Sequence, residues 1–229
     1  EAYDTDGDGR ADVFFYAGAG GRIVRLGYDR TRDAAPDRLV PLDDVPLDDC
    51  RHLVVMLDGI ACDVVREYRR QGGFSLFHEP ARVVAAFPTV SGVGAADTLG
   101  GVAILGVEAK YFDYSKNRIV GGAEMYLSGG NQLHKRLIHY QAGPLAGAIG
   151  YVVPWKVFFH ELNALKKTFD RRETREVLGY LAGSAGVGTS HGRAGQLRCL
   201  RHVDRLARQV VTETRGLTQV TVTPDHGHS

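Results

Sequence analysis

The sequence predicts an α/β protein with a mostly parallel sheet covered by helices on both faces. Apolar runs of strand length alternate along the chain with segments of helical periodicity, as βαβ units require. Three apolar runs also end in residues able to do chemistry, at the sheet edge where such folds collect ligands. With 229 residues, 44% of them hydrophobic, the chain is long enough to bury one large core.

Charge and apolar content argue against two classes of partner. The net charge is +1, with positive and negative side chains interspersed, so no basic field predicts binding to a nucleic acid duplex. No run approaches the roughly 18 consecutive apolar residues of a membrane span. Cys50, Cys62 and Cys199 lack metal-site spacing and are expected to be mostly buried small residues, with one disulfide left open.

Residues 1–49 are expected to form an acidic loop, a hairpin and a connector. Carboxylates at loop positions 1, 3, 5 and 9, with a glycine at position 6, can wrap a Ca²⁺ ion. These carboxylates are Asp4, Asp6, Asp8 and Asp12. Phe15 takes the place of the Glu that an EF-hand would need, so the segment resembles the DxDxDGxxD loops of integrin-like β-repeats. The alternative is a solvated acidic turn.

A β-hairpin is predicted directly after this loop, with strands at 13–16 and 22–26 and a glycine-rich turn at 18–21. Residues 30–50 are rich in Asp and Pro and predict a connector. A Ca²⁺ ion in the loop would hold the edge of the fold together and would take no part in chemistry.

Residues 50–229 are predicted to form the α/β domain. The predicted strands are 52–57, 81–86, 176–182 and 218–223, and the predicted helices are 62–70, 155–169 and 194–214. The first of these strands is a continuous apolar run, which favours burial on both faces of a parallel sheet. The helical segments carry apolar residues on one side and charged residues on the other.

Asp58, Ser91 and the pair Asp225–His226 each follow a predicted strand. Each has a simple alternative: a turn or helix cap at Asp58, an N-cap of a helix beginning near Gly92 at Ser91, and a loop at Asp225–His226. Because the carboxyl ends of parallel strands meet at one edge of a sheet, their joint occurrence favours a shared site.

These motifs resemble those of the alkaline phosphatase superfamily, most closely its type I phosphodiesterase/nucleotide pyrophosphatase branch. In that branch a strand ends in LDG, as at 54–59, and a Pro-Thr-x-Thr or Pro-Thr-x-Ser turn carries the nucleophile, as at 87–91. A later strand ends in SDHG, where this chain reads PDHG at 224–227. The resemblance covers about residues 50–229 and implies an alkaline-phosphatase-like fold that hydrolyses phosphate mono- or diesters with divalent metal ions.

The resemblance also implies residue roles. Ser91 would form a covalent phospho-serine, which metal-activated water then hydrolyses. Asp58, Asp225 and His226 would bind one Zn²⁺ or Mn²⁺ ion of a pair about 4 Å apart, which clamps the attacking and leaving oxygens.

The chain departs from the superfamily at two expected ligands. Ala185 and Thr189 stand where the superfamily has the Asp and His of an Asp-x-x-x-His pair, and a methyl group cannot bind a metal. His191 would have to reach back to replace them, and its alternative is an exposed loop histidine. A further histidine ligand is expected beyond Ser229, in a domain truncated at its C-terminus, with His228 as a local substitute. A site with only one ion is therefore an alternative to the pair.

Two functions of different class follow. The leading hypothesis is a metal-dependent phosphate-ester hydrolase acting on a small substrate. The alternative is a catalytically weak or inactive superfamily member that serves as a binding module. Sulfate esters are disfavoured because no C/S-x-P-x-R context occurs. The calcium-type loop and the resemblance favour a periplasmic or extracellular location.

Four other residues have side chains of a kind that can bind a metal. They are His160 and Glu161, on one predicted helix, and the pair His134 and His139. None has the spacing of a ligand set, and residues five apart share a helix face poorly. They are interpreted as ordinary surface or interface groups.

Overall fold

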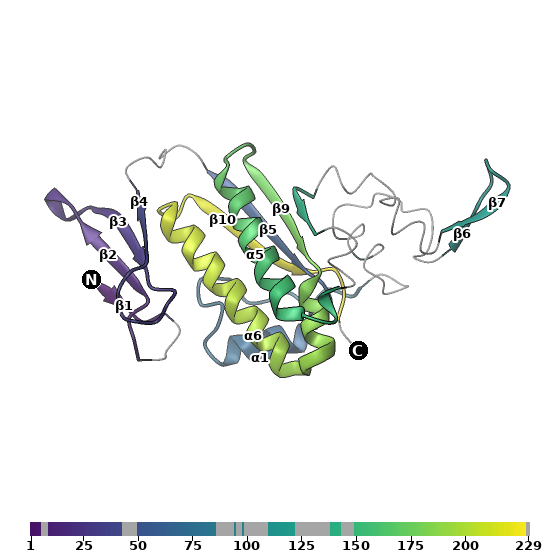
Figure 1. The fold of residues 1–229 in the computed structure, drawn as a ribbon, viewed down its shortest axis with the longest axis horizontal. Coiled ribbons are helices and arrows are strands. Elements are labelled where there is room, and N and C mark those ends of the chain that lie inside the picture. The colour runs from purple at the N-terminus through teal and green to yellow at the C-terminus, as the bar shows by residue number, and fades with distance from the viewer. Residues whose placement is uncertain are drawn as a thin grey trace. The chain divides into compact units, whose positions relative to one another are not determined.

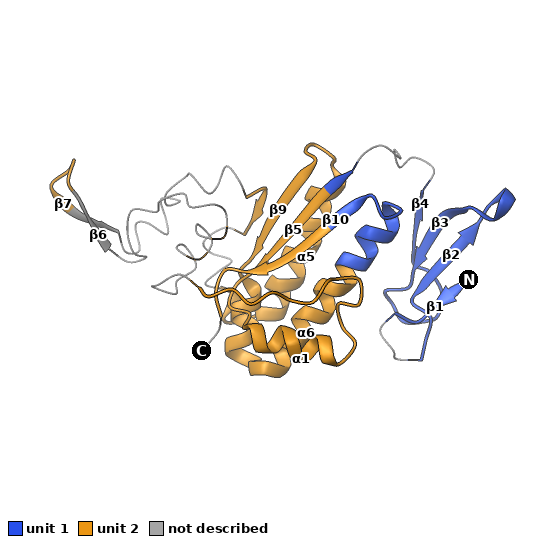
Figure 2. Cartoon of the chain, turned by 180° about the vertical axis from the view of Figure 1, so that it is seen from behind, with its two compact units in different colours: residues 1–51, 207–219 blue, residues 52–206, 220–229 orange. Residues whose placement is uncertain are grey.

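A computed structural model of the chain describes residues 1–5, 9–42, 50–85, 94, 98, 110–121, 138–142 and 149–227. The chain divides into two compact units, 1–51 with 207–219 and 52–206 with 220–229 (Figure 2). A parallel sheet with helices and a separate antiparallel sheet are both present, which confirms the predicted α/β class (Figure 1).

The antiparallel sheet belongs to the first unit and has the strand order β1-β2-β3-β4. The strands are β1 (Ala2–Tyr3), β2 (Val13–Ala17), β3 (Ile23–Tyr28) and β4 (Arg38–Pro41), and the 3-10 turn η1 (Ala19–Gly21) joins β2 to β3. The predicted connector at 30–50 is wrong over β4. Val40 lies opposite Leu26 and packs against that buried residue, so burial and strand pairing prevail over the Asp- and Pro-rich composition.

The second sheet has the order β10-β5-β9-β8. Its strands are β5 (Arg51–Leu57), β8 (Tyr140–Gln141), β9 (Glu176–Leu181) and β10 (Thr218–Pro224). β5 runs parallel to β9, with His52 opposite Glu176 and Leu57 opposite Leu181. The two faces of β5 are not equally buried. Val55 and Leu57, on one face, are each 1% exposed, whereas His52 and Val54, on the other, are half-buried.

Three helices are described in full: α1 (Cys62–Arg70), α5 (Pro154–Asp170) and α6 (Gly183–Glu213). In Figure 1, α5 runs along the sheet. It packs closely on β9 at Gly179, where an added Cβ would lie 2.4 Å from Leu165 Cδ1. The predicted helices at 62–70 and 155–169 agree with α1 and α5 to within a residue.

The start of α6 differs from the prediction, because the Gly/Ser-rich segment before residue 194 is helical and breaks only at Gly192, where φ is +57°. Glycine is about 1 kcal/mol less favourable than alanine in a helix. Here, close packing explains why glycine stands at two of these positions. A Cβ at Gly183 would lie 2.8 Å from the backbone nitrogen of Phe158, and one at Gly186 would lie 2.4 Å from the carbonyl oxygen of Gly150.

The strand predicted at 81–86 is wrong over its described residues, 81–85, which form no strand. Val83 and Val84 are 82% and 84% exposed. Valine favours strands because it packs on a half-buried pleated surface, and these two valines have no such surface. The sequence also missed β8 and a small antiparallel pair, β6 (Lys110–Asp113) with β7 (Arg118–Gly121).

The cysteines are all free: Cys199 is buried, Cys62 is half-buried and Cys50 is exposed. The predicted burial is therefore wrong for Cys50, which comes just before the first residue of β5 and so is not part of the buried strand. Within the described residues, no helix has both the length and the apolar character that crossing a membrane requires.

Candidate metal centre

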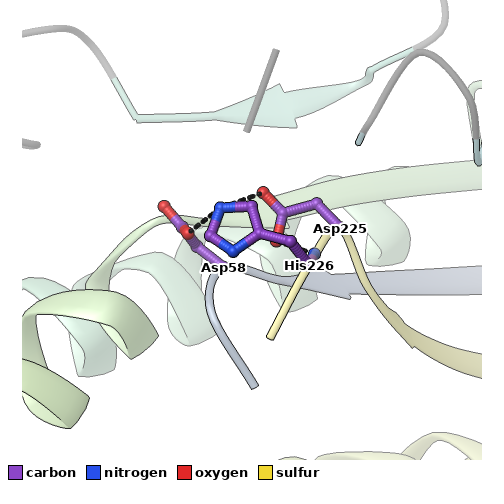
Figure 3. A group of neighbouring side chains, drawn as sticks. All are labelled: Asp58, Asp225 and His226. Carbon is purple, nitrogen blue, oxygen red and sulfur yellow. Dashed lines mark hydrogen bonds and ion pairs between the residues drawn. The ribbon is translucent and has the colours of Figure 1, made fainter. Parts of the chain in front are cut away.

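Asp58, Asp225 and His226 come together just beyond the carboxyl ends of β5 and β10 (Figure 3). One ligand atom from each residue lies within 4.8 Å of the other two. His226 Nε2 is 3.5 Å from Asp58 Oδ1 and 3.6 Å from Asp225 Oδ2. Neighbouring strands thus bring Asp58 together with the pair Asp225–His226, which is far from it in sequence.

The orientation of His226 places Nε2 beside two carboxylates. Its Nδ1 lies 2.7 Å from the carbonyl oxygen of Gly227. A carbonyl can only accept, so Nδ1 carries the proton, and Nε2 of the neutral ring then has a lone pair. Three lone-pair atoms facing one another are stable only with positive charge among them, either a second ring proton or a bound cation.

The same orientation is typical of metal-bound histidines, which donate their second ring N–H to a backbone carbonyl or a carboxylate. Two carboxylate oxygens and one imidazole nitrogen also match the ligands that Zn²⁺ and Mn²⁺ accept. The donor set therefore fits one divalent transition-metal ion.

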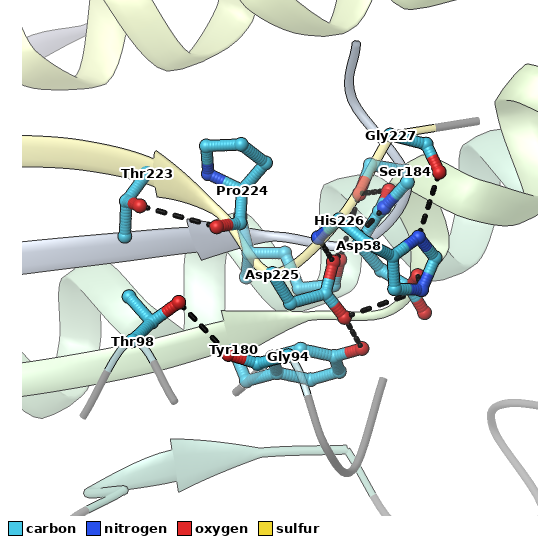
Figure 4. A network of polar contacts seen from close by, with 12 residues as sticks. Asp58, Gly94, Thr98, Tyr180, Ser184, Thr223, Pro224, Asp225, His226 and Gly227 are labelled. Atoms are coloured by element: carbon cyan, nitrogen blue, oxygen red, sulfur yellow. Dashed lines mark hydrogen bonds and ion pairs between the residues drawn. The ribbon is translucent and has the colours of Figure 1, made fainter. Parts of the chain in front are cut away.

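Asp225 is held in place on both oxygens. Its Oδ1 accepts from the backbone N–H of His226 at 2.7 Å and of Gly59 at 3.2 Å. Its Oδ2 accepts from the hydroxyl of Tyr180 at 2.9 Å (Figure 4). Gln196 Nε2 in turn donates to the carbonyl of Gly59 at 3.0 Å. Asp225 is only 4% exposed, and burying a carboxylate is costly unless hydrogen bonds of this kind compensate.

Replacing Tyr180 with phenylalanine is expected to lower the affinity for Zn²⁺ by about 10- to 100-fold, the usual cost of losing an outer partner of a ligand. The variant should also be less stable by roughly 1–3 kcal/mol, because a buried carboxylate loses a hydrogen bond. Zinc titration calorimetry and urea unfolding measure the two effects. Tyr151→Phe is the matched control, since Tyr151 is 57% exposed. Equal affinity in both variants would contradict the role of Tyr180.

The backbone of Asp58 is tied to the turn between β9 and α6. Ser184 Oγ lies 2.8 Å from the carbonyl oxygens of both Asp58 and Leu181, and can donate to either. The N–H of Asp58 donates to the carbonyl of Leu181 at 3.2 Å. The chain then reverses at Gly59, whose φ of +68° favours glycine.

Glu161 lies in the interior, so its interpretation as an ordinary surface or interface group is wrong. It is 0% exposed, and its Oε2 accepts from the N–H of Gly183 at 2.8 Å. Burial raises the pKa of Glu161 to about 7, against the lowering effect of the Gly183 and Ala182 N–H groups and with a smaller rise from Asp58. Among the described residues, Oε1 has no hydrogen-bond partner.

A sequence signal for the burial of Glu161 did exist. Phe158, Leu162, Leu165 and Phe169 form the buried stripe of α5, and position 161 falls on that stripe by helical spacing. Tyr180, on β9, and Ser184 and Gln196, on α6, had no comparable signal, because each is far in sequence from the residue that it contacts at the site.

The remaining predicted ligands lie elsewhere. Ala185 is buried and offers only a methyl group, and Thr189 is exposed. His191 is exposed and contacts the ring of Trp155, with centroids 5.7 Å apart. His191 is therefore not part of the Asp58–Asp225–His226 cluster.

Of the other residues named as candidates, some are described by the structure and some are not. His160 is exposed, and the Nδ1 of exposed His139 accepts from the N–H of Leu178 at 3.1 Å. Ser91, His134 and His228 lie outside the described residues.

The calcium-type loop is described at Asp4 and Asp12 but not at Asp6 and Asp8. Both oxygens of Asp12 accept from Thr5, one from the N–H and one from the hydroxyl, each at 2.8 Å. Asp4 Oδ2 accepts from the N–H of Gly9 at 2.8 Å. These bonds close the loop, and Ca²⁺ binding there stays a prediction.

No protein-family model, curated protein or solved structure matches the chain. Function is therefore inferred from the side chains and from the sequence motifs.

Proposed function

We propose that this chain binds one Zn²⁺ or Mn²⁺ ion through Asp58, Asp225 and His226 and hydrolyses phosphate mono- or diesters with Ser91 as the nucleophile. The observation that carries the proposal is the convergence of two carboxylates and one imidazole nitrogen, with one ligand atom of each residue within 4.8 Å of the other two. The Asp58 and His226 side chains are 15% and 16% exposed, so a small substrate can approach them from solvent.

A divalent ion at this position would polarise a phosphoryl oxygen and favour the ionised form of a nearby hydroxyl. The Ser91 oxygen would form a bond to phosphorus as the ester oxygen leaves, and water would then hydrolyse the phospho-serine. The position of Gly94 supports this role. At Gly94, three residues after Ser91, an added Cβ would lie 2.4 Å from the carbonyl oxygen of Asp225 (Figure 4).

The motifs at 54–59, 87–91 and 224–227 agree with this proposal through their resemblance to the alkaline phosphatase superfamily. We extend the proposal to the fold, which we take to be alkaline-phosphatase-like over about residues 50–229. The parallel pairing of β5 with β9 and the position of Asp58 and Asp225 at strand ends support it.

A second candidate is a module that binds metal or phosphate without turnover. The observation in its favour is the loss of ligands for a second ion, since Ala185 is buried with only a methyl group and Thr189 is exposed. Without a second ion, half of the charge stabilisation at an in-line displacement is missing.

The test is the release of nitrophenol from mono- and bis-nitrophenyl phosphate by the full chain, with and without added Zn²⁺ or Mn²⁺. We expect metal-dependent release that Ser91→Ala abolishes while metal binding persists. Ser190→Ala is the matched control, because exposed Ser190 only donates to the carbonyl of Gly186 within its own helix. Metal binding without turnover would favour the binding module, and no metal binding would exclude the hydrolase and a metal-binding module alike.

A further inference from the structure

We propose that Glu161 is a positioning residue of the metal centre, which sets the place of Asp58 through the turn between β9 and α6. This inference rests on the proposed metal site. It adds a residue from α5, a helix that supplies none of the three candidate ligands. It predicts that metal affinity depends on whether the side chain at position 161 is long enough to hydrogen-bond the turn.

The first link joins α5 to the turn. Glu161 Oε2 accepts from the N–H of Gly183 at 2.8 Å, and the nearby N–H of Ala182 acts to lower the pKa of this carboxyl group. These N–H groups lie at the start of α6, where backbone donors have no partner within the helix. The carboxyl group of Glu161 therefore caps α6 from a neighbouring helix.

The second link joins the turn to the site. Ser184 follows Gly183 directly, and its Oγ lies 2.8 Å from the carbonyl oxygen of Asp58. The N–H of Asp58 donates to the carbonyl of Leu181, on the other side of the same turn. A shift of the turn would therefore move the backbone of Asp58, and with it one of the three candidate ligands.

Close packing makes this connection stiff. An added Cβ at Gly183 would lie 2.8 Å from Glu161 Oε2 and 2.8 Å from the backbone nitrogen of Phe158. The turn thus lies directly against α5 with no side chain between them, and Glu161 is 0% exposed. Well-packed contacts of this kind transmit small displacements.

The test compares Zn²⁺ affinity, by titration calorimetry, among the wild type, Glu161→Asp and Glu161→Gln. Glu161→Asp keeps the charge but shortens the side chain by one methylene, so it should lose the contact with Gly183 and bind about 10- to 100-fold more weakly. Glu161→Gln keeps an acceptor oxygen at full length and should bind like the wild type. The reverse order would mean that only the charge matters and would overturn the positioning role.

Ser184→Ala provides a second test that leaves Glu161 intact. It should weaken Zn²⁺ binding to a similar degree, and the Glu161→Asp/Ser184→Ala double variant should lose less than the sum of the two effects, because both act through one connection. Additive losses would contradict that connection.

Leu165→Ala is the control for general loss of stability, since fully buried Leu165 packs on Gly179 within β9 and not on Gly183. Its Zn²⁺ affinity should match the wild type. If the wild type binds Zn²⁺ and neither Glu161→Asp nor Ser184→Ala changes the affinity, the inference is wrong and the metal site stands. If the wild type binds neither Zn²⁺ nor Mn²⁺, the proposed function itself fails.

Discussion

Replacing Asp225 with asparagine is expected to lower the affinity for Zn²⁺ or Mn²⁺ by about 100-fold or more, above the usual cost of losing an outer partner of a ligand. The change removes one of the two negative charges at the site and keeps the shape of the side chain. The amide oxygen can still accept from the N–H groups of His226 and Gly59. The amide N–H₂, placed at the Oδ2 position, can donate to His226 Nε2.

In the variant, a hydrogen bond from the amide to His226 thus stands in place of the cation. The chain should therefore stay folded although it no longer binds the ion. Titration calorimetry measures the affinity, and nitrophenol release should fall with it. Asp170→Asn is the matched control, because Asp170 pairs with Lys166 near the end of α5 and its side chain is 43% exposed. Unchanged metal affinity in the Asp225 variant would show that the ion binds elsewhere or not at all.

Much of the fold could be predicted because the main elements have continuous apolar faces. The helix at 155–169 and the strand at 52–57 bury residues such as Phe158 and Leu57 almost completely, and periodicity detects such faces. The first part of α6 could not be predicted in this way. Its glycines favour a loop locally, whereas in the fold Gly183 and Gly186 lie in a helix and pack against distant backbone, which no local pattern reveals.

The failed strand at 81–85 illustrates the opposite error. Val83 and Val84 have high strand propensity, yet both side chains are exposed. A strand requires partners as well as suitable residues, and a single sequence does not reveal the partners.

The sequence predicts the candidate ligands better than it predicts the residues that hydrogen-bond to them. Asp58 and Asp225 directly follow apolar runs, and strand ends are where a parallel sheet gathers ligands. Tyr180 bonds Asp225 across 45 positions, and no spacing rule joins residues at that separation. Glu161 is predicted only in part. The apolar stripe of α5 predicts that its side chain is buried, but nothing in the sequence predicts its contact with Gly183.

The stability of the fold should fall as the pH rises from about 4.5 to about 7, because of Glu161. Burial raises the pKa of this carboxyl group from 4.5 to about 7 in the folded chain. Below pH 4.5 the group is protonated in both the folded and the unfolded chain, and its contribution to stability is fully present. Between the two values only the folded chain holds the proton, so each step upward in pH favours unfolding, and above pH 7 the loss is complete.

The size of this loss follows from about 1.4 kcal/mol for each pH unit between 4.5 and 7, which gives about 3 kcal/mol. Glu161→Gln cannot titrate, so its unfolding free energy relative to the wild type should rise by about 3 kcal/mol between pH 4 and pH 8. Urea unfolding with a chelator present measures the difference without interference from metal binding. Glu173→Gln, a change at an exposed carboxylate, should run parallel to the wild type. A Glu161→Gln profile that also ran parallel would show that Glu161 ionises inside the fold at its ordinary pKa, and that the polar groups around it solvate its charge.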